Sequence, residues 1–580
     1  MPIMPKAENM KVVDYIVSVL AESGIDTVFG QIGGFNADFV DAIARAGKQK
    51  FVLNFHEQAA GFAANALAMV KETIGVATSS GAPSSCNLLP GIANAFFDSV
   101  PCVFIVGSVH SKSLRKSKEI RQNAFEEIDM VSMVAEITKH ADRIMDPSTI
   151  RYHLERALYF ANDGRKGPVL LDLPYDVARA EVDISALKGF EPPEKKRFSP
   201  IDREKIVTYL KAAARPVILL GGGSRSETSR EALIKFLEKV PIPVVASLCG
   251  LDSLQHDHPC FSGFIGHYGN RYANFALANS DCLIVLGSRL DERQIAGDKA
   301  HFAPKAKIIR VDIDAVELGR NLPEDVSIYG TVEYFLQEML KAEFGDLHYS
   351  KWHRAIEVWK QRYSSHVPDA HHVDANNFLH HISQYLPDEA VICADVGQNQ
   401  MFTAQSLRLR KGMKLLNSSG YGTMGYSLPA AIGAAYAKPE ATVISVNGDG
   451  GLQMNLQELQ AVKRDRLPIK IIVLNNNCLG MIRRLQERIY DNRTTGSVSG
   501  YECPDYRILA QAYHLNYVLI DEVGKYAFVE DALKGPAPTL IEVALPENII
   551  NNPEPGAAID LQTPLLSEQE NDKIKSECIF

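Results

Sequence analysis

Residues 443–451 read VISVNGDGG, and this stretch decides the fold. A short apolar strand pattern ends on a glycine, an aspartate and two further glycines. The stretch 471–478 reads IIVLNNNC and also ends an apolar run on polar side chains, with twenty-four residues between Gly450 and Asn475. Both polar clusters are therefore expected at the carboxyl ends of strands, which is the edge where open α/β sheets bind ligands.

The residue types in these two clusters predict a diphosphate held through a divalent cation. Asp449 offers an anionic oxygen, Asn476 a neutral one, and the backbone carbonyl of Cys478 a third, which is the kind of oxygen set that Mg²⁺ prefers. Gly450 and Gly451 let backbone N–H groups approach phosphate oxygens without a Cβ in the way. A tight turn explains the glycine–aspartate–glycine run taken alone, whereas the combination with the second cluster favours the diphosphate site.

The same alternation of strand and helix patterns extends on both sides of the deciding stretch. Strands followed by helical patterns predict an α/β fold of three doubly wound parallel-sheet domains. The Pro-rich charged segment 191–196 is expected to be a linker, and the polar helical stretch 341–375 is expected to be another connection. The expected organisation is an N-terminal domain at 1–188, a central domain at 200–342, a C-terminal domain at 372–548 and an irregular tail at 549–580, which is either disordered or laid over another surface.

Composition narrows the class of protein before any motif is used. The chain has 580 residues and a formal charge of −9 at pH 7, which argues against nucleic acid as a partner. Nine cysteines occur singly, as is typical of a reduced cytoplasmic chain. Residues 1–8 contain no apolar stretch like that of a secretory signal, and no apolar run reaches the length of a membrane span. We therefore expect a cytoplasmic protein with no membrane segment.

The two clusters at 448–451 and 475–478 resemble the signature of thiamine-diphosphate-dependent enzymes. The neighbouring segments 453–459 and 479–482 are similar to the acetolactate synthase group, and the resemblance covers about residues 10–550. It implies pyrimidine-binding, central and diphosphate-binding domains in that order, with thiamine diphosphate and Mg²⁺ as cofactors. It also implies decarboxylation of a 2-oxo acid, pyruvate being the expected one, and transfer of the two-carbon unit to a carbonyl acceptor.

Glu57 opens an Ala-rich helical pattern in the first domain. A carboxylate at a helix start is favoured by the helix dipole, and this is one explanation of Glu57. The resemblance implies another, in which Glu57 hydrogen-bonds a ring nitrogen of the aminopyrimidine and so promotes loss of a proton from the thiazolium carbon. Glu57 and Asp449 are 392 positions apart. In the family the cofactor lies between domains of two subunits, so the resemblance implies a homodimer or homotetramer.

The resemblance carries three further cofactor contacts over to loops of the third domain. Gly397, Gln398 and Asn399 match the second loop that contacts the diphosphate, although the family's usual third residue is histidine. The backbone carbonyl of Gly422 would face the exocyclic amine of the cofactor. Met424 would wedge beneath the two rings, and its alternative explanation is ordinary core filling.

Several departures from the acetolactate synthase pattern fall where the family meets its substrates. The glycine-rich loop with Gly33 and Gly34 matches the loop that faces the reacting carbon. Glu126 stands where the family has a neutral glutamine, and we assign it to the catalytic surroundings with Glu57. Leu485 replaces a tryptophan that narrows the acceptor pocket, and residues 79–87 contain an insertion. These departures leave the choice of acceptor open.

Three alternatives follow from the departures. Arg483 and Arg484 are either solvated helix charges or ligands for a larger anionic or nucleotide-linked ketone acceptor in sugar biosynthesis. A decarboxylase that releases an aldehyde without ligation shares the same residues. A non-catalytic relative would be expected to lack Glu57 or Asp449, and both are present.

The central block leaves the presence of a flavin open. Residues 221–223, 247–248 and 287–293 are similar to positions that hold FAD in acetolactate synthases, whereas other relatives keep this domain without flavin. FAD and an empty domain are therefore both alternatives. The histidine clusters at 256–258 and 371–372 lack a third ligand at useful spacing, and we interpret them as loop histidines.

Overall fold

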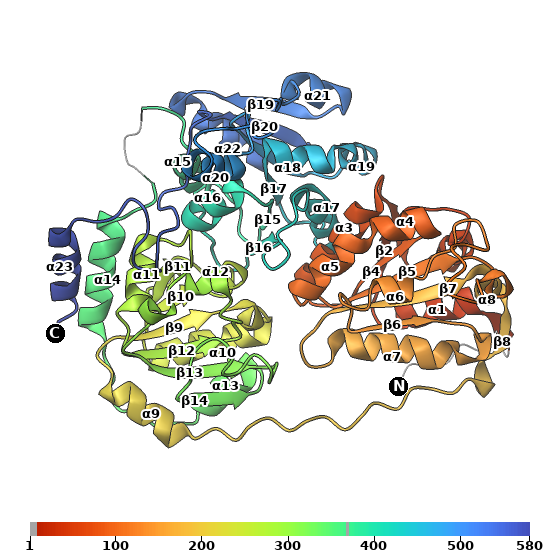
Figure 1. The fold of residues 1–580 in the computed structure, drawn as a ribbon, viewed down its shortest axis with the longest axis horizontal. Helices are drawn as coiled ribbons and strands as arrows, with labels where there is room; N and C mark the ends of the chain where they lie inside the picture. The colour runs from red at the N-terminus through yellow and green to blue at the C-terminus, as the bar shows by residue number, and fades with distance from the viewer. Residues whose placement is uncertain (1–8, 367–370, 580) are drawn as a thin grey trace.

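Three six-stranded sheets organise the chain, and all neighbouring strands within each sheet are parallel. The structure, a computed structural model, describes residues 9–366 and 371–579. Figure 1 shows the N-terminal domain at the right, the central domain at the lower left and the C-terminal domain at the top. Helices cover both faces of the sheets, so the predicted α/β class with three doubly wound domains is confirmed. Residues 1–8, where no secretory signal was expected, lie outside the described residues.

The N-terminal domain has the strand order β3-β2-β4-β5-β7-β6. The first and last strands of this domain, β1 (Asn9–Lys11) and β8 (Glu181–Asp183), form a separate antiparallel pair. The strands of the main sheet are β2 (Thr27–Gly30), β3 (Lys50–Leu53), β4 (Gly75–Ser79), β5 (Cys102–Ser108), β6 (His140–Arg143) and β7 (Pro168–Pro174). The helices are α1 (Val12–Glu22), α2 (Ala37–Ala46), α3 (Glu57–Lys71), α4 (Ala82–Asn87), α5 (Leu89–Phe97), α6 (Met130–Met133), α7 (Ile150–Asn162) and α8 (Tyr175–Arg179).

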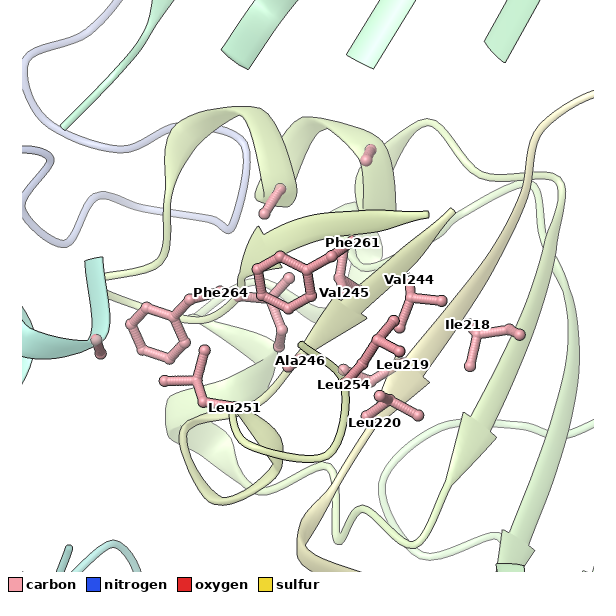
Figure 2. Packing of buried hydrophobic residues seen from close by; sticks show 14 of the residues in the cluster. Ile218, Leu219, Leu220, Val244, Val245, Ala246, Leu251, Leu254, Phe261 and Phe264 are labelled. Carbon is pink, nitrogen blue, oxygen red and sulfur yellow. The ribbon is translucent and has the colours of Figure 1, made fainter. Parts of the chain in front are cut away.

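The central domain has the strand order β11-β10-β9-β12-β13-β14. Its strands are β9 (Pro216–Leu220), β10 (Val244–Ala246), β11 (Phe261–Phe264), β12 (Cys282–Leu286), β13 (Lys307–Asp312) and β14 (Val326–Tyr329). Its helices are α9 (Arg203–Ala212), α10 (Glu227–Lys239), α11 (Arg271–Ala278), α12 (Glu292–Ile295), α13 (Val332–Met339) and α14 (Ser350–Arg362). Strands covered on both faces read as continuous apolar runs. Figure 2 shows this core, with labelled side chains of β9, β10 and β11 packed together: Ile218, Leu219, Leu220, Val244, Val245, Ala246, Phe261 and Phe264.

The C-terminal domain has the strand order β16-β15-β17-β18-β20-β19. Its strands are β15 (Val391–Ala394), β16 (Lys414–Asn417), β17 (Val443–Gly448), β18 (Lys470–Asn475), β19 (Asn516–Ile520) and β20 (Thr539–Ala544). Its helices are α15 (Ala375–Ile382), α16 (Gln398–Ser406), α17 (Ser427–Ala437), α18 (Asp449–Met454), α19 (Leu459–Asp465), α20 (Gly480–Ile489), α21 (Tyr506–Ala512) and α22 (Ala527–Lys534).

Helices α3 and α17 hold the first and third domains together (Figure 1). The rings of Phe62 and Tyr426 meet edge to face with centroids 5.5 Å apart. Gly433 permits this close approach, because a Cβ there would lie 2.1 Å from the carbonyl oxygen of Ala63. The two domains that the resemblance assigns to one cofactor are therefore rigidly packed within a single chain.

The segments between and after the domains take different forms. Residues 191–200 have no helix or strand and run as an extended connection between the first two domains (Figure 1). The expected connection at 341–375 holds α14, whose Trp352 and Trp359 are fully buried, so this helix covers the central sheet.

The tail is laid over the central domain, and Arg271 donates hydrogen bonds to the carbonyl oxygens of Gln562 and Pro564. It ends in helix α23 (Glu568–Glu577), so the prediction of an irregular tail is wrong for these residues. The helix starts with a capping box formed by Ser567 and Glu570. This Ser-x-x-Glu pattern is a sequence signal for the start of a helix.

Two further findings bear on the class of protein. Within residues 9–366 and 371–579, no helix is both long enough and apolar enough to span a bilayer. All nine cysteines are free thiols, six of them buried.

Candidate active site

Asp449, Asn476 and Cys478 lie together at the carboxyl edge of the third sheet. Strands β17 and β18 are parallel neighbours, so the residues that follow them meet at the same edge. Asp449 is buried, and its Oδ2 accepts a hydrogen bond from the backbone N–H of Cys478 at 3.3 Å. The structure thus brings together the three residues that the sequence suggested as metal ligands.

The Asn476 amide is wedged among oxygens. One of its terminal atoms lies 3.0 Å from the carbonyl oxygen of Cys478 and 3.2 Å from Asp449 Oδ2. Its other terminal atom lies 3.2 Å from Gln398 Oε1. Turning the amide nitrogen toward Cys478 and Asp449 would set the amide oxygen against the Gln398 oxygen. Hydrogen bonding within the protein therefore leaves two oxygen–oxygen contacts in the first orientation and one in the second.

A divalent cation removes this conflict. With the Asn476 oxygen facing Asp449 and Cys478, its nitrogen donates to Gln398, and its oxygen lies close to one oxygen of each of the other two residues. Neighbouring oxygens bound octahedrally to one Mg²⁺ at about 2.1 Å lie about 3 Å apart, which matches the two separations of 3.0 Å and 3.2 Å. The donor set and its spacing therefore fit a magnesium ion.

Protein donors hold the other carboxylate oxygen of Asp449. The Gly450 N–H donates to Oδ1 at 2.6 Å and the Tyr501 hydroxyl at 2.9 Å. Burial raises the pKa of Asp449 above its ordinary value, and the hydrogen bond from Tyr501 acts in the opposite direction. A cation beside Oδ2 would also favour the carboxylate. Sequence reasoning missed Tyr501, because it lies in a loop 52 positions away that carries no motif.

The loop at Gly397 lies against the same edge. Gly397 has a φ of +136°, a region that favours glycine, and α16 follows it. The Asn399 amide nitrogen donates to the carbonyl oxygen of Asp395 at 2.8 Å. Its Oδ1 lies 3.2 Å from the position a Cβ would take on Gly448. Gln398, Asn399 and Asp449 therefore belong to one continuous cluster.

Asp395 ties three of these loops together, and sequence reasoning missed it. Its Oδ1 accepts from the backbone N–H of Gly425 at 2.9 Å, and its Oδ2 accepts from the backbone N–H of Ser427 at 3.1 Å. Burial raises the pKa of Asp395 to about 6. A Cβ on Gly451 would lie 2.7 Å from Oδ1, so only glycine fits there. An aspartate at the carboxyl end of an apolar run, now β15, was the signal available in the sequence.

Gly422 and Met424 lie beside the same cluster. Gly422 has a φ of +72°, and its N–H donates to the Ser418 hydroxyl at 3.0 Å. The Met424 methyl group lies 3.3 Å from the position a Cβ would take on Gly450. Met424 is only half-buried, so the structure places it at the edge of the site rather than in the core.

Glu57 is the first residue of α3 and is buried with 6% of its surface exposed. Its two carboxylate oxygens each accept one side-chain hydrogen bond. Ser84 Oγ donates to Oε1 at 2.7 Å, and Asn87 Nδ2 donates to Oε2 at 3.0 Å. Both donors belong to α4, which lies in the stretch 79–87 that contains the expected insertion. Helix α4 therefore fixes the orientation of Glu57.

Gly33, Gly34 and Glu126 lie at the carboxyl edge of the first sheet. A Cβ on Gly33 would lie 2.5 Å from the Ser80 Cβ, whereas a Cβ on Gly34 would meet nothing within 4 Å. Glu126 Oε2 lies 2.5 Å from the position a Cβ would take on Gly81. Glu126 also has a φ of +62°, an uncommon conformation for a residue with a side chain, and one that gathers at functional sites.

Glu458 from the third domain supports the chain just before Glu57. Its Oε1 accepts from the backbone N–H groups of Phe55 and His56 at 2.8 Å and 3.0 Å, and its Oε2 accepts from Asn54 Nδ2 at 3.0 Å. Burial raises the pKa of Glu458 to about 7. Sequence reasoning placed this residue only within a family-like segment and assigned it no role.

The structure forms two clusters rather than one. We call Gly33, Gly34, Glu57 and Glu126 the first-domain cluster, and Asp449, Asn476, Cys478 and the loops around them the third-domain cluster. Among the described residues, no hydrogen bond or ion pair joins a member of one cluster to a member of the other. Both clusters nevertheless stand at carboxyl edges of parallel sheets.

Comparison with known proteins identifies the family. Three thiamine pyrophosphate enzyme models match the chain: the N-terminal TPP binding domain over residues 10–133, the central domain over 203–339 and the C-terminal TPP binding domain over 395–543. The acetolactate synthase large subunit of Lactococcus lactis is 34% identical, covering 91% of this chain and 92% of its own. The chain belongs to the thiamine pyrophosphate enzymes, in the acetolactate synthase group.

Other acetolactate synthases are similarly related. The large subunit from Cyanidium caldarium is 35% identical over 93% of this chain and 94% of its own. A probable large subunit from Methanocaldococcus jannaschii is 35% identical over 92% of each chain. The predicted family and enzyme class are therefore confirmed. The matched N-terminal and C-terminal models are both thiamine pyrophosphate binding domains.

The departures of this acetolactate synthase-like chain do not favour a larger anionic acceptor. Arg483 is buried, with its guanidinium donating to the carbonyl oxygen of Ile549 at 2.7 Å. Arg484 makes a two-pronged ion pair with Glu554, donating from Nε to Oε1 and from Nη2 to Oε2, both at 2.8 Å. Neither arginine is a solvated helix charge, so that interpretation is wrong, and neither is free for a substrate. Leu485 is 44% exposed.

The central domain of this family member contains a small cavity at the carboxyl edge of its sheet. Its volume is about 50 Å³, and its lining includes Cys249, His267, Arg289 and Arg293. The buried His267 Nε2 has no hydrogen-bond partner among the described residues. The lining thus supplies polar groups to a ligand, although the volume does not hold a flavin ring system.

The glycine-rich turn beside this cavity has an explanation of its own. A Cβ on Gly221 would lie 2.1 Å from the Gly287 carbonyl oxygen, and one on Gly223 would lie 2.9 Å from the Gly287 Cα. Close packing of two loops therefore requires these glycines whether or not a flavin binds.

The histidine clusters have ordinary surroundings. His256 is buried, stacks on Phe261 with centroids 4.1 Å apart, and places Nε2 3.0 Å from the Leu251 carbonyl oxygen. His371 and His372 are exposed. In the part of the chain that the structure describes, no group of three or more His, Cys, Asp or Glu side chains is arranged to hold a metal ion. The predicted magnesium ligands are an Asp, an Asn and a carbonyl, which is a different donor set.

Proposed function

We propose that the protein decarboxylates pyruvate with thiamine diphosphate and Mg²⁺ and joins the two-carbon unit to a carbonyl acceptor. A second pyruvate is the acceptor that acetolactate requires, because two three-carbon acids minus one CO₂ give a five-carbon product. The observation that carries the proposal is the convergence of oxygens from Asp449, Asn476 and Cys478 at 3.0–3.2 Å. The identity of 34–35% to acetolactate synthases over more than nine-tenths of the chain supports it.

The third domain is proposed to hold the diphosphate through the cation. Asp449, Asn476 and the Cys478 carbonyl would bind Mg²⁺, and Gly450, Gly451 and the loop at 397–399 would approach the phosphate oxygens. Tyr501 keeps the Asp449 carboxylate in position by donating to Oδ1. Glycines with no Cβ allow the close approach that backbone N–H groups need in order to bind phosphate.

The first domain is proposed to supply the proton chemistry. Thiamine diphosphate, when bound, supplies a carbon nucleophile and accepts the electrons released with CO₂. Glu57 would hold a proton at the aminopyrimidine ring nitrogen, with its orientation set by Ser84 and Asn87. Gly34, which borders open space, and Glu126 would line the volume where the substrate carbonyl reacts.

A homodimer, or a homotetramer built from it, is proposed as the active form. The two clusters lie on different domains and share no hydrogen bond within the described chain. The first-domain residue Phe125, beside Glu126, is 81% exposed, and aromatic side chains of this kind are enriched in the cores of interfaces between subunits. Sedimentation of the purified protein tests this, and an active monomer would contradict it.

FAD and a cytoplasmic location are the remaining parts of the proposal. Arg289, Arg293 and the unpartnered His267 Nε2 support a dinucleotide in the central domain, although the lining would have to move for a flavin ring. An absorbance spectrum of the supernatant after denaturation decides whether flavin is released.

The free cysteines support a reducing compartment, and fractionation of the source cells tests that location.

The decisive experiment is product analysis with pyruvate as the only substrate. We expect acetolactate in amounts that match half the pyruvate consumed, with CO₂ as the other product. Acetaldehyde as the sole product would overturn the carboligase assignment and leave a decarboxylase. Activity should require both thiamine diphosphate and a divalent cation, so dialysis against a chelator serves as the control.

A further inference from the structure

A second polar cavity lies between the central and C-terminal domains, apart from both clusters. Its volume is about 320 Å³, and residues of α11, α14, α15 and α16 line it together with the segments that follow α14 and α16. Its lining includes Lys360, His366, His380, Gln405 and Arg408. At about 30 Å³ per water molecule, this volume holds about ten waters or one small organic anion.

Positive charge dominates the lining. The Arg408 guanidinium makes no hydrogen bond or ion pair with any residue that the structure describes. Lys360 faces Glu357 at 3.9 Å, and this is the one carboxylate among the described lining residues. The Glu357 side chain is 56% exposed, so solvent screens its charge. The cavity therefore holds more cationic charge than the chain neutralises.

Burial and neighbouring positive charge lower the pKa values of two basic groups in the lining. Burial lowers the pKa of Lys360, and the charge of Arg408 lowers it further. Burial, followed by His366 and Arg408, lowers the pKa of His380 to about 4. The imidazole rings of His366 and His380 stack with centroids 3.9 Å apart. Such mutual repulsion is relieved when an anion enters.

Two buried polar atoms of lining residues also lack a hydrogen-bond partner among the described residues. They are His380 Nδ1 and Gln405 Oε1. Gln405 is 7% exposed, and its amide nitrogen already donates to the Tyr268 carbonyl oxygen at 2.8 Å. Its oxygen is therefore fixed as an acceptor that needs a donor. A buried acceptor left without a donor destabilises the fold, so a ligand donor here would be favoured.

We propose that this cavity binds a small phosphate monoester that carries a hydroxyl group. Arg408 and Lys360 would bind the phosphate oxygens, and Gln405 Oε1 would accept from the ligand hydroxyl. An arginine fork matches phosphate geometry, and a doubly charged anion balances two fixed cations. Helix α16 runs from Gln398, in the third-domain cluster, to Ser406, at the cavity. Nine residues of helix span about 13 Å, so this site and the cofactor site can be filled together.

The test is calorimetric titration of the full-length protein with glycerol 3-phosphate, with and without saturating thiamine diphosphate and Mg²⁺. We expect saturable binding whose affinity is the same in both conditions. Arg408→Gln should weaken it by about 10- to 100-fold, the usual effect of losing a charged hydrogen bond. Arg354→Gln is the matched control. Arg354 lies on α14, the helix that carries Lys360, but it is exposed and lies outside the lining. It should leave the affinity unchanged.

Several outcomes would overturn the proposal. No saturable heat with glycerol 3-phosphate, equal affinity in Arg408→Gln and the unaltered protein, or loss of binding when the cofactor is present would each do so. Inorganic phosphate that binds as tightly as glycerol 3-phosphate would refute the hydroxyl contact. If circular dichroism shows that Arg408→Gln does not fold, Lys360→Gln carries the same test, since Lys360 lies on the partly exposed side of α14. Failure of thiamine diphosphate to bind would affect only the proposed function.

Discussion

The third-domain cluster and the first-domain cluster stand at equivalent edges of two similar sheets, yet they are assembled differently. In the third domain, Asp449, Asn476 and Cys478 follow two adjacent parallel strands directly, and the sheet alone brings them together. In the first domain, Glu57 is oriented by side chains of α4, and the chain before it is held by Glu458 from another domain. One site is therefore local in its construction and the other is assembled from distant parts.

This difference suggests that the two clusters will respond differently to mutation. The third-domain cluster is rich in glycine and in buried carboxylates that hold backbone N–H groups, so a change there should affect binding of the cation and the cofactor. The first-domain cluster holds the Glu57 carboxylate through side-chain donors, so a change there should affect turnover while binding is kept. The following predictions test that division.

The largest effect is expected for Asp449→Ala. The variant removes an oxygen ligand from the proposed cation and leaves Tyr501 and Gly450 without their acceptor. We expect loss of measurable turnover, together with a fall of more than about 100-fold in affinity for thiamine diphosphate at fixed Mg²⁺, which exceeds the usual effect of an outer-shell change. Fluorescence titration with the cofactor measures it. Asp521→Asn, a surface aspartate paired with Lys525, is the control that should behave normally.

Glu57→Gln is expected to separate turnover from binding. Glutamine keeps the size of the side chain but cannot hold a proton for a ring nitrogen, so turnover should fall by about 10²- to 10⁴-fold, the range for a general acid or base. Affinity for thiamine diphosphate should stay within a few-fold. Steady-state turnover and cofactor titration on the same preparation check both parts. Unchanged turnover would refute the role of Glu57, and lost cofactor binding would refute the division between the clusters.

Tyr501→Phe probes how the third-domain cluster holds its proposed ligand. The variant removes the hydroxyl that donates to Asp449 Oδ1 at 2.9 Å and leaves the ring in place. Partners of metal ligands contribute about 10- to 100-fold to affinity, so we expect the Mg²⁺ concentration that supports half-maximal activity to rise by about that factor. Tyr490→Phe, a change at an exposed tyrosine, supplies the comparison. An equal response of the two variants would exclude Tyr501 from the site.

The contrast between the clusters also explains what the sequence could predict. Strand patterns and the polar residues after them were sufficient for the fold class and for the grouping of Asp449 with Asn476, because a parallel sheet aligns strand ends wherever the chain runs. Tyr501 and Asp395 were missed because their roles depend on which loops fold back over that edge. No periodicity in the sequence encodes such a contact.

Two other contacts have a similar physical origin. The stretch 79–87 was interpreted as a departure near the substrate, and the structure adds that its helix α4 supplies both side-chain donors to Glu57. For Arg484 a solvated charge and a ligand for an anionic acceptor were the two alternatives, whereas Glu554, 70 positions away in the tail, pairs with it. In each case the deciding partner is distant in the chain, and charge or composition within a local window could not identify it.

Glu458 is the residue through which the third domain supports the first-domain cluster. Its pKa is raised by burial to about 7 from an ordinary value of 4.5, so the folded state binds a proton more readily than the unfolded state between these values. That contribution to stability is complete below about pH 4.5 and is lost as the pH rises through 7. At about 1.4 kcal/mol per unit, it amounts to a loss on the order of 3 kcal/mol across the window.

Glu458→Gln should remove this loss while changing activity at pH 7 by less than about tenfold, the smallest activity effect expected here. Glutamine can still accept from the N–H groups of Phe55 and His56, and its nitrogen can donate to Asn54 Oδ1, which is buried without a partner among the described residues. Urea unfolding at pH 5 and pH 8 measures the effect. The unaltered protein should lose more stability between these pH values than the variant. Only the unaltered protein has the buried Glu458 carboxyl group, which must lose a proton as the pH rises. Equal losses of stability would show that Glu458 does not titrate between pH 5 and pH 8. Glu458 would then hold the chain before Glu57 as an ionised, hydrogen-bonded carboxylate throughout that range.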